Sequence, residues 1–109
     1  MKLEGKVAIV TGGARGNGLA AARCLAKEGV DIAIADICAN MKTIPYEMST
    51  ADTMAKAVAG IKELGREAIG IQCDVRKAAD VEAMVKKVVE KFGKIDILVN
   101  NAGNTSMVA

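Results

Sequence analysis

The chain contains no histidine and no tryptophan, and its 109 residues include only one phenylalanine, one tyrosine and one proline. The lack of histidine excludes a Ser-His-Asp triad, a histidine general base and a histidine-ligated metal site. The two serines, Ser49 and Ser106, have no candidate base near them in the sequence. Any chemistry must therefore come from a bound cofactor or from residues outside these 109 positions, and we expect no metal site.

Aromatic residues make up 2% of the chain, and its 15 basic and 13 acidic residues are interspersed and leave a net charge of only +2. A nucleic-acid site needs a basic surface, commonly with aromatic rings on which bases stack. Apolar runs are only a few residues long, so none spans a bilayer, and no secretion signal opens the chain. We therefore expect a globular protein that binds neither nucleic acid nor membrane.

The three cysteines, Cys24, Cys38 and Cys73, are an odd number and show no C-x-x-C spacing. Disulfide frameworks of secreted proteins use paired cysteines, whereas free cysteines behave as small apolar groups in a reducing compartment. We therefore expect all three side chains to be buried and unpaired, in a cytoplasmic protein.

Apolar patterning predicts four strands that alternate with three helices. Short apolar runs indicate buried strands, and apolar positions three or four residues apart indicate helices. The expected strands are 6–11, 30–36, 68–73 and 95–100, and the expected helices are 17–28, 51–64 and about 81–92. The apolar stripe of the last helix comprises Val81, Val85, Val88 and Phe92. Connections of this length require parallel strands. We therefore expect an α/β fold, a partial doubly wound Rossmann fold with a parallel sheet of about four strands in the order 3-2-1-4.

Glycines follow the first expected strand with the spacing G-x-x-x-G-x-G. A dinucleotide diphosphate needs a close approach to the backbone, which a Cβ would obstruct, and free N–H groups at a helix N-terminus. In that role Gly12 would form the tight turn, Gly16 would admit the diphosphate and Gly18 would let the helix pack closely on the sheet. The same glycines are also compatible with an ordinary turn that binds nothing.

An acidic residue, Asp36, ends the second expected strand. At this position of a dinucleotide-binding fold a carboxylate accepts hydrogen bonds from the adenosine ribose. It would also repel a 2′-phosphate, so Asp36 favours NAD over NADP. Arg15 is a counter-signal because it could pair with a 2′-phosphate, but no Arg or Lys follows at Ile37 or just after it. A solvated aspartate at a strand end is the plain alternative.

Three motifs resemble those of the short-chain dehydrogenase/reductase family, and the likeness runs from Lys6 to Gly103. They are Thr11-Gly12-x-x-x-Gly16-x-Gly18, Cys73-Asp74-Val75 and Asn100-Asn101-Ala102-Gly103. The resemblance implies that Asp74 contacts the adenine, that Val75 lines its pocket, and that the last motif stabilises the sheet and lies along the cofactor. The expected NAD-binding residues are Gly12, Arg15, Gly16, Asn17, Gly18, Asp36, Ile37, Asp74, Val75, Asn101, Ala102 and Gly103.

The catalytic residues of that family, an Asn, a Ser and a Tyr-x-x-x-Lys, have no counterpart here. Tyr46 is the only tyrosine, Thr50 stands four residues after it, and Ser106 comes too early to be the catalytic serine. We therefore expect residues 1–109 to be the N-terminal, NAD-binding part of a longer alcohol dehydrogenase or carbonyl reductase. The resemblance implies a small alcohol or ketone substrate and a homo-oligomer. The alternative is a truncated, non-catalytic nucleotide-binding module.

Two further expectations concern the long connection and the last strand. Residues 36–50, together with the polar Asn17, resemble the mycofactocin-coupled subgroup of the family, although an ordinary variable loop explains them as well. In the order 3-2-1-4 the last strand would be an uncovered edge, although its composition is that of an interior strand. Such an edge promotes aggregation, so we expect residues 1–109 to be poorly soluble or oligomeric when expressed alone.

Overall fold

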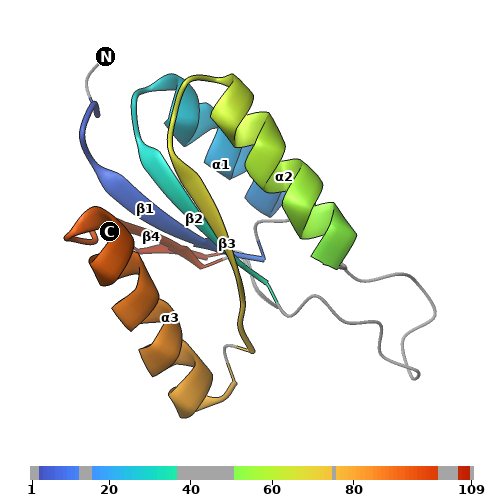
Figure 1. Ribbon diagram of the computed structural model, residues 1–109, viewed down its shortest axis with the longest axis vertical. Helices are drawn as coiled ribbons and strands as arrows, with labels where there is room; N and C mark the ends of the chain where they lie inside the picture. The colour runs from blue at the N-terminus through green and yellow to red at the C-terminus, as the bar shows by residue number, and fades with distance from the viewer. Residues whose placement is uncertain (1–2, 13–15, 37–50, 75, 101–105, 109) are drawn as a thin grey trace.

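Strands and helices alternate along the chain, as the apolar pattern predicts. The computed structural model describes residues 3–12, 16–36, 51–74, 76–100 and 106–108. All predicted elements are present in these ranges, and their ends differ from the predicted ones by up to three residues (Figure 1). None of the helices described there is both long and apolar enough to cross a membrane. The elements are β1 (Val7–Thr11), α1 (Gly16–Lys27), β2 (Asp31–Asp36), α2 (Ala51–Glu63), β3 (Ala68–Gln72), α3 (Ala78–Phe92), β4 (Ile97–Asn100) and β5 (Ser106–Val108).

The strands form one sheet in the order β3-β2-β1-β4-β5. Strand β1 pairs in parallel with β2 and β4, and β2 pairs in parallel with β3, which confirms the predicted order and the α/β class. The register aligns Thr11 with Ala35 of β2 and with Asn100 of β4. Asp36 is aligned with Gln72 of β3. The carboxyl ends of the four parallel strands therefore meet at one edge of the sheet.

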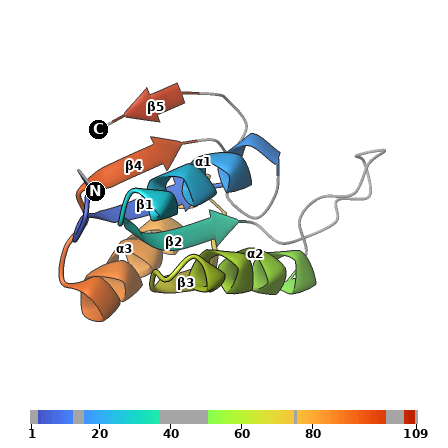
Figure 2. The ribbon, with the colours of Figure 1, turned by 90° about the horizontal axis from the view of Figure 1, so that it is seen from above.

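Strand β4 is not the edge that the four-strand prediction implies. Strand β5 pairs with it in the antiparallel direction, with Leu98 opposite Val108 and Asn100 opposite Ser106, and Figure 2 shows β5 beside β4. A three-residue strand is too short to leave a periodic pattern, so apolar periodicity could not reveal it. Among the described strands, the edges of the sheet are β3 and β5.

Helices cover both faces of the sheet, with α1 and α2 on one face and α3 on the other (Figure 1). Because successive side chains of a strand point to opposite faces, Ala8 and Val10 pack toward α1 and α2. Val7 and Ile9 pack toward α3. This two-sided burial explains the unbroken apolar runs in β1 and β2. Full burial of a branched aliphatic side chain stabilises the fold by about 1.5–3 kcal/mol, so the central strands form a rigid frame for the edge.

The apolar stripe predicted for α3 is wrong at one position. Val85 keeps 38% of its surface exposed, whereas Met84 and Val88 are buried against the sheet. The helix turns by about 100° per residue, and Met84 completes the 3, 4 and 4 spacing from Val81 to Phe92. The sequence pattern favoured valine over methionine, and only the packing decided between the two neighbouring positions.

The prediction of buried cysteines is confirmed for Cys73 and wrong for Cys24. Cys73 is buried on the α3 side of the sheet, and burial raises the pKa of its thiol, with smaller contributions from the carboxylates of Asp80 and Asp74. Cys24 is exposed on α1, because the buried face of that helix consists of Gly18, Ala22 and Ala26. Cys38 lies outside the described residues.

Candidate functional site

The turn after β1 is held against the end of β2 by one main-chain hydrogen bond. The N–H of Gly12 donates to the carbonyl oxygen of Ala35 at 2.7 Å. Gly12 has a φ of 64°, in the left-handed region that glycine adopts without a steric penalty. The glycine turn therefore lies beside Asp36, the next residue of β2, although 24 positions separate Gly12 and Asp36 in the sequence. The N–H of Gly12 is used within the protein and is not available to a ligand.

Helix α1 begins at Gly16, which also has a φ of 64°. An added Cβ at Gly16 would meet no protein atom within 4 Å, so the backbone there faces open space. Its first turn carries no acidic residue that would neutralise the positive end of the helix dipole. Asn17 is exposed, and Gly18 is buried on the face that packs on the sheet. The backbone at Gly16 therefore fits a close approach by an anionic group, as predicted for a diphosphate.

Asp36 closes β2 and is bound through its main chain to the strand beside it. Its carbonyl oxygen accepts a hydrogen bond from the N–H of Cys73 at 2.8 Å. The residue is only 6% exposed, and together with Thr11 it forms the buried polar set of the described chain. Buried carboxylates are seldom tolerated without specific partners, so Asp36 differs from the solvated strand-end aspartate of the plain alternative.

A hydrogen bond that sequence analysis did not predict joins the ends of β1 and β4. The hydroxyl of Thr11 lies 3.0 Å from Oδ1 of Asn100 and 3.3 Å from the carbonyl oxygen of Val99. Both groups stand where the strand order changes direction around β1, which is where open α/β sheets bind ligands. The available signal was positional, because each residue is the last of its strand and directly precedes a predicted motif.

Asp74 follows β3 and is held by groups from both directions of the chain. Its N–H donates to Oδ2 of Asp80 in the first turn of α3 at 3.0 Å. Its carboxylate accepts hydrogen bonds from the main chain and the guanidinium of Arg76 at 2.9–3.0 Å. These hydrogen bonds lower the pKa of the Asp74 carboxyl to about 2. Sequence analysis predicted Asp74 but neither Arg76 nor Asp80, since nothing in their spacing distinguishes them from solvated charges.

The described chain contains six of the twelve predicted cofactor-binding residues. Gly12, Asp36 and Asp74 come together at the carboxyl edge through the Gly12–Ala35 and Cys73–Asp36 hydrogen bonds. Gly16, Asn17 and Gly18 open α1. Their role in cofactor binding stays a prediction. The other six lie outside the described residues, and so does the 37–50 segment that resembles the mycofactocin-coupled subgroup; these six are Arg15, Ile37, Val75, Asn101, Ala102 and Gly103.

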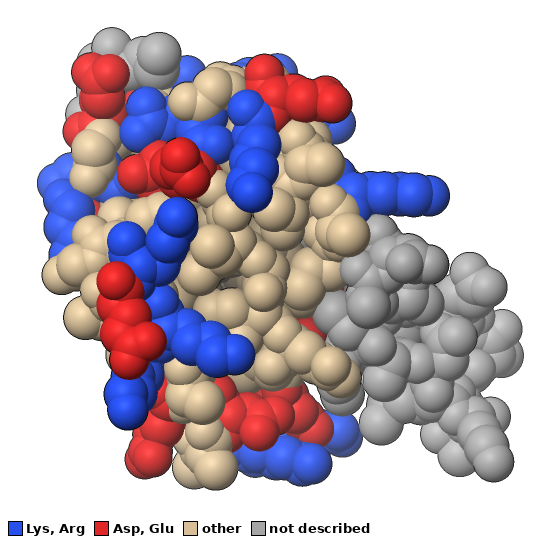
Figure 3. All heavy atoms as spheres, in the orientation of Figure 1, with Lys and Arg blue, Asp and Glu red and all other residues tan. Residues whose placement is uncertain are grey.

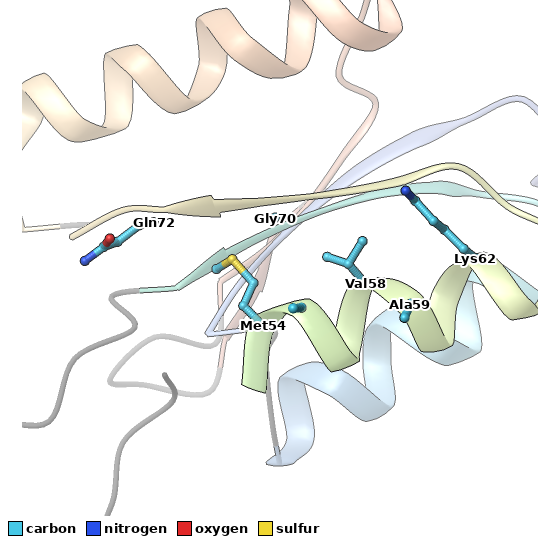
Figure 4. A pocket seen from close by; sticks show the side chains of 7 residues that line it. Met54, Val58, Ala59, Lys62, Gly70 and Gln72 are labelled. Atoms are coloured by element: carbon cyan, nitrogen blue, oxygen red, sulfur yellow. The ribbon is translucent and has the colours of Figure 1, made fainter. Parts of the chain in front are cut away.

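A groove of about 430 Å³ lies between α2 and the edge strand β3 (Figure 4). Met54 and Val58 extend from α2 toward Gly70, and Lys62 and Gln72 lie toward opposite ends of the groove. None of the residues that line it belongs to the predicted cofactor site. On this side of the molecule, uncharged side chains gather between α2 and α3, and acidic and basic groups surround them (Figure 3). The mixed signs give this face no continuous basic surface.

Three known proteins illustrate the similarity. The chain is 39% identical over 106 residues to (-)-trans-carveol dehydrogenase of Rhodococcus erythropolis, covering 97% of this chain and 38% of the relative. It resembles the crystal structure of carveol dehydrogenase from Mycobacterium avium in complex with NAD, with a TM-score of 0.88, 38% identity and coverage of 97% and 38% of the two chains. A short chain dehydrogenase from Burkholderia cenocepacia in complex with NADP gives a TM-score of 0.79, 46% identity and coverage of 95% and 38%.

The chain thus spans less than two-fifths of the length of such curated relatives. The family model described as short chain dehydrogenase matches residues 6–109, which is nearly the whole chain and includes the glycine turn, Asp36 and Asp74. The fold, the strand order and the motifs agree with this match. The chain belongs to the short-chain dehydrogenase family.

Proposed function

We propose that the carboxyl edge of the sheet binds the adenosine and diphosphate of NAD. The site would serve an oxidoreductase that interconverts small alcohols and carbonyl compounds by hydride transfer. The observation that supports this most is the hydrogen bond from Gly12 to Ala35, which sets the glycine turn beside the buried Asp36. The strand order changes direction around β1 at the same edge, and ligands of open α/β sheets bind at such points.

The diphosphate would lie against the start of α1. The open space at Gly16 gives an anion room to reach the backbone, and a Cβ at that position would occupy it. Because the N–H of Gly12 is bonded to Ala35, the donors to the diphosphate would be the first N–H groups of α1. These groups have no partner within the helix and carry its positive partial charge. Arg15 and Asn17 would flank the diphosphate.

The ribose of the adenosine would bind to Asp36. A carboxylate accepts hydrogen bonds from both ribose hydroxyls, whereas a 2′-phosphate would bring two further negative charges next to it. Structural neighbours with NAD and with NADP both exist, so the family alone does not decide between the cofactors. Asp36 supports NAD for this chain. The adenine would contact Asp74, with Ile37, Val75, Asn101, Ala102 and Gly103 along the cofactor.

When bound, the nicotinamide would supply hydride transfer, and the residues of this chain would hold and orient the cofactor. The 109 residues contain no Tyr-x-x-x-Lys to move a proton to or from the substrate oxygen. We therefore expect these residues alone to bind NAD without oxidising NADH in the presence of a ketone. The same observation supports the alternative of a non-catalytic nucleotide-binding module. Turnover of any ketone by residues 1–109 would contradict both statements.

The cellular setting and the assembly are part of the proposal. Cys24 and Cys73 are free thiols, which supports a reducing, cytoplasmic compartment. The relatives named as dehydrogenases of carveol and cyclohexanol support a small alcohol or ketone as the substrate of the whole protein. A homo-oligomer follows from the family resemblance, and sedimentation of the protein tests it.

Calorimetric titration of the 109-residue chain with NAD and NADP tests the cofactor site. Asp36→Ala should weaken NAD binding by about 1–3 kcal/mol, because charged hydrogen bonds to the ribose are lost, and it should narrow the preference for NAD over NADP. Glu82→Gln is the matched control, because it removes one negative charge from the exposed face of α3 and should leave both affinities unchanged. Unchanged NAD affinity in Asp36→Ala would remove this residue from the site.

A further inference from the structure

The carboxylate of Asp74 is held in one orientation by a single neighbour. Oδ1 accepts hydrogen bonds from the main-chain N–H of Arg76 at 3.0 Å and from its Nε at 2.9 Å. Oδ2 accepts one from Nη2 of Arg76 at 2.9 Å. Two parallel guanidinium bonds fix both the position and the plane of a carboxylate. Asp74 can therefore turn only if it loses the contact with Arg76.

The number of bonds leaves one free acceptor position on this carboxylate. A carboxylate offers about four acceptor positions, two on each oxygen. Within the described chain, Arg76 occupies both positions on Oδ1 and one on Oδ2. The main-chain N–H of Asp74 is used by Asp80, so this residue offers a ligand no donor. The side chain of Asp74 is 12% exposed, which leaves the carboxylate within reach of solvent.

We propose that Arg76 is a positioning and specificity-determining residue, which holds Asp74 so that its remaining acceptor position selects a base with an exocyclic amino group. Adenine presents such a donor, its N6 amine, whereas hypoxanthine presents a carbonyl oxygen there. A fixed, ionised acceptor opposite that oxygen would leave two acceptors facing each other without a proton. The inference rests on the proposed function, since it assigns the base end of the dinucleotide to the Asp74 side of the edge.

Arg66 provides a natural comparison for Arg76. It holds Asp31 through the same pair of atoms, Nε and Nη2, at 3.1 and 2.9 Å, but at the opposite end of the sheet. Both arginines thus make the same kind of bond to an aspartate. If Arg76 acts only through the stability of the fold, replacement of Arg66 should have the same consequences for the ligand. If Arg76 acts through the base, the two replacements should differ.

The experiment compares the binding of NAD and of nicotinamide hypoxanthine dinucleotide by calorimetry, for the original chain and for Arg76→Ala, Arg76→Lys and Arg66→Ala. The original chain should prefer NAD by about tenfold or more, the effect of one charged hydrogen bond. Arg76→Ala should reduce that preference to a few fold, because Asp74 can then turn away. Arg76→Lys keeps the charge but not the paired donors, so it should restore part of the preference. Arg66→Ala should keep it in full.

A second variant supports the reading at Asp74 itself. Asp74→Asn places an amide where the carboxylate was, and its NH₂ can donate to the hypoxanthine oxygen, so the preference for NAD should disappear or reverse. Equal loss of both ligands in Arg76→Ala, with the ratio unchanged, would overturn the inference, and so would an original chain that binds NAD without preferring it. A chain that binds neither dinucleotide would instead contradict the proposed function.

Discussion

The two ends of the sheet use aspartates in different ways. At the amino end, Asp31 accepts hydrogen bonds from Arg66 and from the N–H of Glu67, across 35 and 36 positions of the chain. Asp96 accepts one from the N–H of Val7 at 2.9 Å, across 89 positions. These bonds join distant segments, so they stabilise the folded chain relative to the unfolded one.

At the carboxyl end, the side chain of Asp74 bonds to Arg76, only two positions away. A bond this local can form in an open loop and contributes little to long-range order. Asp36 is buried at the same end beside the glycine turn. The comparison teaches that the amino end carries polar groups for stability, whereas the carboxyl end has its polar groups arranged for a ligand.

The largest expected effect is at the carboxyl end. Gly16→Val should abolish NAD binding, since the added side chain fills the open space in front of the backbone. It should also lower the free energy of unfolding by about 1–3 kcal/mol, because a β-branched residue is strained at a φ of 64°. Calorimetry and thermal unfolding measure the two effects.

Gly60→Ala is the matched control for that variant. Gly60 lies inside α2 without a positive φ or a close neighbour, so alanine should stabilise the helix by about 0.5–1 kcal/mol and leave NAD binding unchanged. Normal NAD affinity in Gly16→Val would contradict the assignment of the glycine turn.

A change at the amino end should do the reverse. Asp31→Ala leaves the partly buried Arg66 without its carboxylate and should lower the free energy of unfolding by about 1–3 kcal/mol, with no change in NAD affinity. A double-mutant cycle with Arg66→Ala separates the pair interaction from the effects of each side chain. Weaker NAD binding in Asp31→Ala would break the division between the two ends.

The smallest expected effect depends on pH. The N–H of Val7, with a further contribution from Lys94, holds the pKa of the Asp96 carboxyl below its ordinary value. Because the folded pKa is the lower one, the stabilisation is fully present above about pH 4 and is lost as the pH falls through the folded value. Asp96→Asn should therefore flatten the loss of stability below about pH 4, measured by denaturant unfolding at several pH values.

Asp74 contributes to the same acid range, since Arg76 lowers its pKa to about 2. That part should persist in Asp96→Asn and disappear in Asp74→Asn. Identical pH profiles for the original chain and Asp96→Asn would show that this carboxylate does not stabilise the folded state.

Several features could be predicted from the sequence because they depend on local pattern. The runs at Val7–Thr11 and Asp31–Asp36 are apolar throughout because helices cover both faces of these strands. Parallel order then follows from the length of the connections. The positions of Gly12, Asp36 and Asp74 at strand ends could be predicted for the same reason, since the ends of parallel strands meet at one edge.

Other features depended on packing that no local pattern records. The burial of Met84 in place of Val85 depended on which side of α3 meets the sheet, and β5 became visible only through its pairing with β4. The bond between Thr11 and Asn100 joins groups 89 positions apart.

By itself, the sequence determined the alternation of strands and helices, the family and the residues that stand at the strand ends, because these follow from short-range periodicity and motif spacing. Only the tertiary structure decided which polar groups are bound to which. Hydrogen bonds such as those from Gly12 to Ala35 and from Arg76 to Asp74 depend on distances of a few tenths of an ångström, and folding sets those distances.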